Sequence, residues 1–288
     1  MRSLPFDIPH SALLARQPFE FNPGSKTGLL CVHGFTGSPY EVRPLGEHFA
    51  RKGWRVRGIV LPRHGGLPDA LKGARWQEWP AAARAALDEL SASCEHVFIV
   101  GLSMGGLVTT SLAAQESAKP GSKLRACAML AAPSALYDSR SKLVKLGQYV
   151  IPWFYPLKFV NFNNAATRAH IQHVTGITFD FDDAQKVSAY KNAIKLPTGA
   201  IAQLLRYIDH SRALLPQVRT PAFVAQGTRD TVVARDSADV IGARLGSARK
   251  HVGWYEGFFH EMPLHHDAPR LFADIERFFD EALASAGR

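Results

Sequence analysis

The sequence Gly101–Gly105 has the form Gly-x-Ser-x-Gly and stands between two apolar runs of different character. The run before it, His96–Val100, is short and rich in β-branched residues, which is typical of a buried strand, whereas Leu107–Ala114 suits a helix packed against a sheet. A strand that turns sharply into a helix forces the residue at the bend into a strained conformation, and flanking glycines remove Cβ atoms that would clash there. The spacing therefore predicts a nucleophile elbow, with the Ser103 hydroxyl clear of the sheet and above the positive end of a helix. The alternative is a glycine-rich turn whose serine only caps that helix.

Strand-like and helix-like segments alternate along most of the chain, which predicts an α/β fold with a mostly parallel sheet and helices on both faces. The expected strands are Gly28–His33, Trp54–Val60, His96–Gly101, Leu124–Leu130, Pro221–Gln226 and His251–Tyr255. The expected helices are Pro39–Lys52, Arg75–Ser91, Met104–Ser117, Arg235–Leu245 and Pro269–Ala286. The first of these helices opens with a capping-box pattern, in which Ser38 is the N-cap and Glu41 follows three residues later.

The alternation breaks between Ser134 and Pro197, where about sixty residues separate two expected core strands. An insertion of this length needs its own structure, so we expect residues 134–197 to form a cap and residues 1–133 and 198–288 to form the core. The cap contains an aromatic, proline-broken run, Tyr149–Val160. Its aromatic side chains either form the core of the cap or face a substrate at the C-terminal edge of the sheet, where open α/β sheets bind ligands. The candidates for substrate contact are Trp153, Phe154, Tyr155 and Phe159.

A serine hydroxyl becomes a nucleophile at neutral pH only when a base, itself oriented by a carboxylate, lies within hydrogen-bond reach. Asp230 follows the expected strand Pro221–Gln226, and His260 follows the strand that ends at Tyr255. Both positions lie at the C-terminal ends of strands, on the same edge as Ser103, and the chain order serine, acid, histidine is the one found with nucleophile elbows. These three residues are the predicted catalytic set, and their chemistry requires no metal and no cofactor.

Other acidic and histidine residues are less well placed, because they lie in expected helices, in a loop that needs bracing, or farther from a strand end. They are His33, Asp209, His210, Asp236, Asp239, His265 and His266. A zinc motif is also disfavoured, because the spacing from His260 to His265 is one residue too long for His-Glu-x-x-His and Pro263 interrupts any helix there.

The negative charge of a tetrahedral intermediate requires preorganised hydrogen-bond donors. One donor is expected to be the backbone N–H of Met104, directly after the serine. The other is expected to be the N–H of Phe35, in the glycine-flanked loop His33–Gly37 that follows the first expected strand. The Phe35 ring is in addition a candidate wall of the substrate pocket.

A formal net charge of +9 would suit a nucleic-acid-binding protein, but the basic residues are spread along the chain and form no nucleic-acid-binding motif. We therefore expect no nucleic-acid partner and, at most, transient contact with an anionic membrane surface. Cys31 and Cys127 lie in apolar strand-like runs, which favours buried free thiols over disulfides. The sequence has no secretory-signal pattern and no apolar run long enough to span a bilayer, so a cytoplasmic location is expected, while the oligomeric state stays open.

Three stretches of the chain together resemble the α/β-hydrolase superfamily and, within it, bacterial carboxylesterases and monoacylglycerol lipases. They are Leu29–Ser38, Gly101–Gly106 and Trp254–Glu256. The resemblance covers residues 28–132 and 220–281 and fades through the cap. It implies an α/β-hydrolase fold and a serine hydrolase with the triad Ser103, Asp230 and His260, oxyanion amides at Phe35 and Met104, and a lid over a hydrophobic acyl tunnel.

Two short stretches depart from the pattern of that superfamily. Phe258 and Phe259 stand before the predicted catalytic histidine, where a small residue is usual. Arg63 stands in the stretch Leu61–Gly66 where a glycine is common. Neither departure touches the predicted nucleophile.

We therefore expect an enzyme that cleaves carboxylic esters through an acyl-serine intermediate, with monoacylglycerols or other medium- to long-chain neutral esters as substrates. The same triad could serve a short-chain carboxylesterase, a thioesterase, a carbon–carbon hydrolase or an acyltransferase, which differ in pocket shape and water access. Dehalogenases and epoxide hydrolases are disfavoured because they carry an aspartate at the elbow. A non-catalytic ligand-binding module is disfavoured because it would need none of the three groups.

Overall fold

The computed structural model describes residues 16–137, 144–175 and 179–286. Its centre is a seven-stranded sheet in the order β1-β3-β2-β4-β5-β8-β9. The edge strand β1 pairs antiparallel with β3, and the other neighbouring strands pair in parallel. These strands are β1 (Phe19–Phe21), β2 (Thr27–Val32), β3 (Arg55–Ile59), β4 (His96–Leu102), β5 (Leu124–Leu130), β8 (Ala222–Gly227) and β9 (Lys250–Tyr255).

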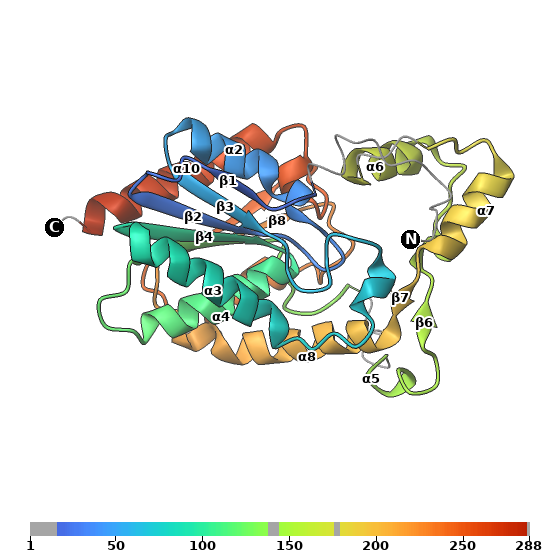
Figure 1. Ribbon diagram of the computed structural model, residues 1–288, viewed down its shortest axis with the longest axis horizontal. Helices are drawn as coiled ribbons and strands as arrows, with labels where there is room; N and C mark the ends of the chain where they lie inside the picture. Colours follow the sequence, from blue (N-terminus) through green and yellow to red (C-terminus); the bar gives the residue numbers. More distant parts are fainter. Residues whose placement is uncertain (1–15, 138–143, 176–178, 287–288) are drawn as a thin grey trace.

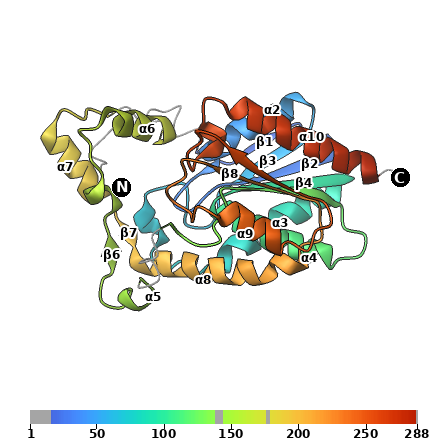
Figure 2. The same ribbon diagram turned by 180° about the vertical axis from the view of Figure 1, so that it is seen from behind.

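Helices cover both faces of this sheet (Figure 1). On one face lie α2 (Arg43–Arg51) and α10 (Ala268–Ala286), and on the other lie α3 (Glu78–Ser93), α4 (Met104–Ser117) and α8 (Thr198–Leu214). The view from behind shows α9 (Ser237–Arg244) on the same side of the sheet as α3 and α4 (Figure 2). The molecule is thus a three-layer α/β structure, and the expected fold class is confirmed.

The two faces of the sheet bury two separate apolar clusters. Leu30 and Val32 of β2 face the cluster on the side of α3, α4 and α8, whereas Leu29 and Cys31 face the cluster on the side of α2 and α10. Because both faces are covered, β2 is apolar at four consecutive buried positions instead of alternating with polar residues. This continuous run is the reason why the strand is recognisable in the sequence.

The expected strands and helices are present, with ends that differ by a few residues, but the start of the first helix is different. Pro39–Glu41 forms a separate 3-10 helix, and α2 begins only at Arg43. The Ser38 side chain makes no capping hydrogen bond, so the capping-box interpretation is wrong. The Glu41 carboxyl does not turn back to Ser38, because it accepts a hydrogen bond of 2.8 Å from the N–H of Gly34 in the loop after β2.

The segment between β5 and α8 extends beyond one end of the sheet (Figure 1). Its described elements are α5 (Val144–Gly147), β6 (Trp153–Phe154), a 3-10 helix (Pro156–Phe159), α6 (Ala165–Thr175), α7 (Ala184–Ala193) and β7 (Leu196–Pro197). It has a small apolar cluster of its own, formed by Phe162, Phe179, Phe181 and Tyr190. We call residues 134–197 the cap segment; their division from the rest of the chain as a domain stays a prediction, and residues 138–143 and 176–178 lie outside the described residues.

Two further expectations concern thiols and membrane spans. Cys31, Cys94 and Cys127 are all free and buried, as expected for the two of them that lie in strands. Within the described part of the chain, every helix falls short of the length and hydrophobicity that a membrane span requires.

Candidate active site

The turn between β4 and α4 has the strained geometry that the sequence predicts for it. Ser103 lies between these two elements with φ of 55° and ψ of −117°, a conformation that L-amino acids rarely adopt. A Cβ atom at Gly101 would lie 2.0 Å from the carbonyl oxygen of Gly105, and one at Gly105 would lie 2.2 Å from the carbonyl oxygen of Val32. Both glycines are therefore required by close backbone approaches on either side of the serine.

Asp230 and His260 meet at the same edge of the sheet, in the loops that follow β8 and β9. The Nδ1 atom of His260 lies 2.8 Å from Oδ2 of Asp230. The other oxygen of Asp230, Oδ1, accepts hydrogen bonds from the amides of Val232 at 2.8 Å and Val233 at 3.2 Å. Because the carboxylate only accepts, Nδ1 of His260 carries the hydrogen, and Nε2 is left as the basic nitrogen.

The protonation of His260 is governed by carboxylates. Burial by itself would lower the pKa of this imidazole, but the hydrogen bond and charge of Asp230, together with the nearby Glu261 and Glu41, outweigh burial and raise the pKa above its ordinary value. An imidazolium at this position is thus stabilised by the groups around it. This is the electrostatic arrangement that a general base needs when it must hold a proton during the reaction.

The two phenylalanines before His260 are accommodated in different ways. Phe258 is fully buried and stacks on the ring of His265 at 3.9 Å between centroids. Phe259 is exposed and contacts the ring of His170 on α6 at 5.1 Å. A Cβ at Gly227 would lie 2.2 Å from the carbonyl oxygen of Phe258, so the loops after β8 and β9 are packed tightly together.

The other departure, at Arg63, has a backbone explanation. Arg63 has φ of 65°, the left-handed region in which glycine carries no steric penalty. Its guanidinium donates to the carbonyl oxygen of Lys72 at 3.1 Å and lies 3.4 Å from Glu78. These contacts hold the arginine in a conformation that a glycine would adopt without strain.

The loop after β2 is braced by the buried imidazole of His33. Its Nδ1 lies 2.8 Å from the carbonyl oxygen of Gly34, and its Nε2 lies 3.0 Å from the backbone nitrogen of Leu61. The first contact requires a hydrogen on Nδ1, and the second requires a lone pair on Nε2, so the two backbone partners select the neutral ring. Burial, with His64 nearby, lowers the pKa of His33 to about 3. The expectation that His33 braces a loop is confirmed.

We expect His33→Ala to lower the free energy of unfolding by about 2–5 kcal/mol, because the carbonyl of Gly34 and the amide of Leu61 each lose a buried partner. The difference in the free energy of unfolding between the wild type and His33→Ala should shrink as the pH falls below about 6.5. In that range the unfolded histidine binds a proton and the folded one does not, so the wild type loses stability towards acid. Urea denaturation between pH 5 and pH 8 measures both effects. The exposed His266→Ala variant is the control, and a loss below 1 kcal/mol in His33→Ala would contradict the bracing role.

The two expected oxyanion amides belong to chain segments that lie close together. Met104 is the first residue of α4, and Phe35 lies in the loop between Gly34 and Gly37. A Cβ at Gly34 would lie 3.3 Å from Cβ of Ser103, so this loop passes directly beside the serine. The assignment of the Phe35 and Met104 amides as oxyanion donors stays a prediction that agrees with this placement.

The expected substrate-contacting aromatics occupy three different environments. Phe35 is partly buried and contacts the rings of His64 and Trp79. Lysine ammonium groups lie over the rings of Trp153 and Tyr155. Nζ of Lys195 is 4.3 Å from the ring centroid of Trp153. Nζ of Lys158 is 4.5 Å from the ring centroid of Tyr155. Phe154 and Phe159 stack on each other at 5.9 Å and are 40% and 81% exposed. A role for the four cap aromatics in substrate binding stays a prediction.

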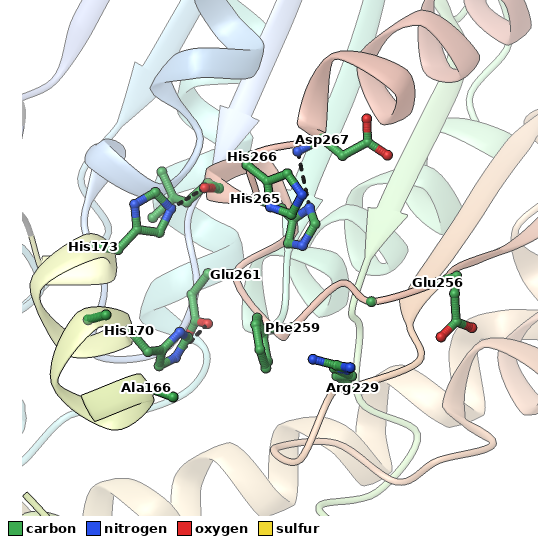
Figure 3. A pocket seen from close by; sticks show the side chains of 13 residues that line it. Ala166, His170, His173, Arg229, Glu256, Phe259, Glu261, His265, His266 and Asp267 are labelled. Carbon is green, nitrogen blue, oxygen red and sulfur yellow. Dashed lines mark hydrogen bonds and ion pairs between the residues drawn. The ribbon is translucent and has the colours of Figure 1, made fainter. Parts of the chain in front are cut away.

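A cavity of about 610 Å³ lies between α6 and the loop after β9 (Figure 3). Phe259 and Glu261, the two neighbours of His260, line it, and none of the expected substrate aromatics does. Across this cavity, Nε2 of His170 lies 3.6 Å from Oε2 of Glu261. Nε2 of His173, on α6, also forms a hydrogen bond with the carbonyl oxygen of Leu264. Two histidines of α6 therefore connect the cap segment to the loop that contains His260.

The remaining acids and histidines make contacts outside the Asp230–His260 pair. Asp209 pairs with Lys145 and Arg212, and Asp239 accepts from the indole of Trp254 at 3.2 Å. In the described residues no group of His, Cys, Asp or Glu side chains has the arrangement of a metal site. The contact that sequence reasoning missed joins the Glu41 carboxyl to the N–H of Gly34, for which the capping-box pattern gave no signal.

Comparison with known proteins gives a family for most of the chain. Residues 24–267 match the family model described as serine aminopeptidase, S33. A curated relative from Bacillus sp. (strain H-257), a thermostable monoacylglycerol lipase, is 26% identical over 94% of this chain and 96% of its own length. A carboxylesterase from Bacillus subtilis (strain 168) is 23% identical over 92% of this chain and 96% of its own length.

Solved structures share the fold. The structure of a metagenome-derived lipolytic enzyme has a TM-score of 0.75 with 24% identity, and it covers 93% of this chain and 98% of its own. The monoacylglycerol lipase of Paleococcus ferrophilus has a TM-score of 0.69 with 14% identity, over 92% of this chain and 98% of its own. At these identities the likeness shows a shared fold and nothing more.

Proposed function

The chain belongs to the serine aminopeptidase family of α/β-hydrolases, and from this premise we propose that it is a carboxylic-ester hydrolase that works through an acyl-serine intermediate. The single observation that carries the proposal is the hydrogen bond of 2.8 Å between His260 Nδ1 and Asp230 Oδ2 at the strand edge where Ser103 stands in its strained turn. The names of the similar proteins, monoacylglycerol lipase and carboxylesterase, support the ester bond as the one that is cleaved.

In the proposed reaction Ser103 is the nucleophile, His260 the base and Asp230 the residue that orients the base. Nε2 of His260 takes the proton from the Ser103 hydroxyl as Oγ bonds to the ester carbon. The imidazolium then gives that proton to the departing alcohol oxygen as the carbon–oxygen bond of the ester breaks. A water molecule repeats the sequence on the acyl-enzyme and releases the carboxylic acid. Asp230 keeps the hydrogen on Nδ1 and stabilises the imidazolium in both halves of the reaction.

The oxyanion of each tetrahedral intermediate would be held by the backbone amides of Phe35 and Met104. Amides at these positions have no need to reorganise, because the loop beside Gly34 and the first turn of α4 are both fixed by packing. The positive end of the α4 dipole adds to the same stabilisation. This pair of donors would supply the larger part of the electrostatic catalysis.

For the substrate we propose monoacylglycerols or other neutral esters with medium to long acyl chains. The relative named monoacylglycerol lipase, which matches over 94% of this chain, supports this class. The aromatic side chains of the cap segment and the Phe35 ring offer apolar surface for an acyl chain. Each methylene that a substrate buries contributes about 0.8 kcal/mol, so binding should improve with chain length until the apolar surface is covered.

We expect kcat/KM to rise along a series of p-nitrophenyl esters from acetate to dodecanoate, by roughly two- to fourfold for each added methylene until a maximum is reached. The series is followed by a monoacylglycerol measured against a triacylglycerol of the same acyl chain, with the monoacylglycerol as the better substrate. A sharp preference for acetate with little activity on octanoate would favour the short-chain carboxylesterase instead. Three further substrates measured beside the esters test the other activities. An acyl thioester tests for a thioesterase, and an alcohol acceptor tests for an acyltransferase. An amino-acid p-nitroanilide tests for the aminopeptidase activity that the name of the family describes.

We also propose a cytoplasmic location and a small-molecule ester or lipid as the partner. Three buried free thiols, Cys31, Cys94 and Cys127, are typical of a reducing compartment. Contact with an anionic membrane surface would be transient and would draw on the net charge of +9.

A further inference from the structure

Glu41 places a carboxyl group inside the loop that is expected to supply an oxyanion amide. Its Oε2 accepts a hydrogen bond of 2.8 Å from the N–H of Gly34. A Cβ atom at Gly37 would lie 2.2 Å from Oε1 of the same carboxyl, so the side chain rests directly on the Cα of that glycine. The carboxyl thus touches the loop at its first and last residues, and Phe35 lies between the two contacts.

The same carboxyl lies close to the predicted nucleophile. A Cβ at Gly34 would lie 3.2 Å from Oε2 of Glu41 and 3.3 Å from Cβ of Ser103. The carboxyl and the serine side chain therefore both approach the position that a Cβ of Gly34 would occupy. Any shift of Gly34 that follows from loss of the carboxyl would move the neighbouring Phe35 amide relative to Ser103.

The charge of Glu41 is coupled to the base. Burial raises the pKa of this carboxyl to about 7; the hydrogen bond from Gly34 opposes that rise, as do the nearby His260 and Arg16, and Glu261 adds to it. In turn, Glu41 is one of three carboxylates, with Asp230 and Glu261, that raise the pKa of His260. The protonation of Glu41 and that of His260 therefore influence each other.

We propose that Glu41 is a positioning residue of the active site, whose carboxyl oxygen fixes the Gly34–Gly37 main chain beside Ser103. The inference rests on the proposed function, because it assumes that Ser103 is acylated and that the Phe35 amide faces the oxyanion. It assigns to Glu41 two separable effects, an acceptor effect on the loop and a charge effect on the base.

Two substitutions separate these effects. Glu41→Gln keeps an oxygen that can accept from the Gly34 N–H but removes the charge, so kcat on the alkaline plateau should stay within about fivefold of the wild type. Its acid limb in the kcat/KM profile should move to lower pH, because the neutral amide no longer stabilises the imidazolium. Glu41→Ala removes the acceptor as well, and kcat should fall by about 10- to 100-fold with KM changed less than threefold, a part of the loss seen when an oxyanion donor is removed. Glu47→Gln, on α2, is the matched control and should keep the wild-type profile.

Thermal unfolding reports the charge effect without any substrate. A carboxyl whose pKa is raised in the folded state contributes stability below its unfolded pKa and loses it as the pH rises through the folded value. The wild type should therefore lose stability relative to Glu41→Gln between about pH 4.5 and about pH 7 and remain less stable above that window. The same scans show whether Glu41→Ala is folded; if it is not, the Glu41→Gln profiles decide the inference.

Labelling with a fluorophosphonate distinguishes failure of the inference from failure of the proposed function. If the wild type is not labelled at Ser103, the proposed function fails. If Ser103 is labelled but Glu41→Ala keeps its kcat within twofold and Glu41→Gln keeps the wild-type acid limb, Glu41 is no positioning residue. Equal loss of kcat in the two variants with an unshifted acid limb would also overturn the inference, because neither the acceptor oxygen that glutamine keeps nor the charge on the base would then explain the loss.

Discussion

Ser103→Ala is expected to reduce kcat by about 10⁴-fold or more, with little change in the binding of substrate. Ser103 would form the covalent bond to the acyl group, and alanine offers no atom that can replace Oγ. The residual rate over water would come from the oxyanion amides and from substrate binding, which the substitution leaves in place. Alanine should adopt the strained backbone of Ser103, with φ of 55°, about as well as serine does. Both residues carry one small substituent on Cα, so the steric cost of this conformation is similar.

The measurement combines steady-state turnover of a p-nitrophenyl ester with mass spectrometry after fluorophosphonate treatment. The wild type should gain the mass of the probe on the peptide that carries Ser103, and the alanine variant should gain none. Ser111→Ala, on α4 and buried, is a control for nonspecific labelling of serines. Full activity of Ser103→Ala, or labelling of another peptide, would exclude the acyl-serine mechanism.

His260→Ala is expected to be about as damaging as Ser103→Ala, since a serine without its base is not activated and the losses of the members of a triad are not additive. Asp230→Asn should lower kcat somewhat less, provided that the ring stays in place. An amide at Oδ2 could donate to Nδ1, and the imidazole would then carry its hydrogen on the wrong nitrogen.

His265→Ala and His266→Ala are the controls for this assignment. His265 stacks on Phe258 at 3.9 Å, and its Nδ1 accepts from the amide of Asp267 at 3.2 Å. Its loss should affect stability more than turnover, and the loss of the exposed His266 should affect neither. If either variant lost activity while His260→Ala remained active, the base would have been placed at the wrong histidine.

The sequence predicts best where a chemical requirement and a backbone requirement coincide. The elbow could be located because two glycines, a strand and a helix must all surround Ser103 within a few residues. Asp230 and His260 could be predicted because each follows the C-terminal end of an expected strand. In a parallel sheet these ends lie on one edge, so residues that follow them in the sequence are expected to lie near one another. Their direct hydrogen bond is a geometric fact that no spacing contains.

Other features could not be read from the sequence because they depend on contacts between distant segments. β1 has only three residues, Phe19–Phe21, and is held by its antiparallel register with β3. The spacing of Ser38 and Glu41 matches a capping box, but the Glu41 carboxyl accepts a hydrogen bond from the amide of Gly34 instead. The sequence does not reveal that this amide lies within reach of the carboxyl. The exposed stacking of Phe154 and Phe159 follows from the path of the cap segment and not from their hydrophobicity.

The short pairing of β6 with β7 brings together the two ends of residues 155–195. Trp153 lies opposite Pro197 and Phe154 opposite Leu196, so the chain leaves and re-enters the rest of the molecule at neighbouring points. The described part of the enclosed stretch has its own apolar cluster and contributes no strand to the seven-stranded sheet. We therefore expect changes of length or sequence between the two ends to leave the register of the large sheet intact. The β6–β7 pair therefore marks the two points at which the residues between them are joined to the part of the chain that carries Ser103, Asp230 and His260.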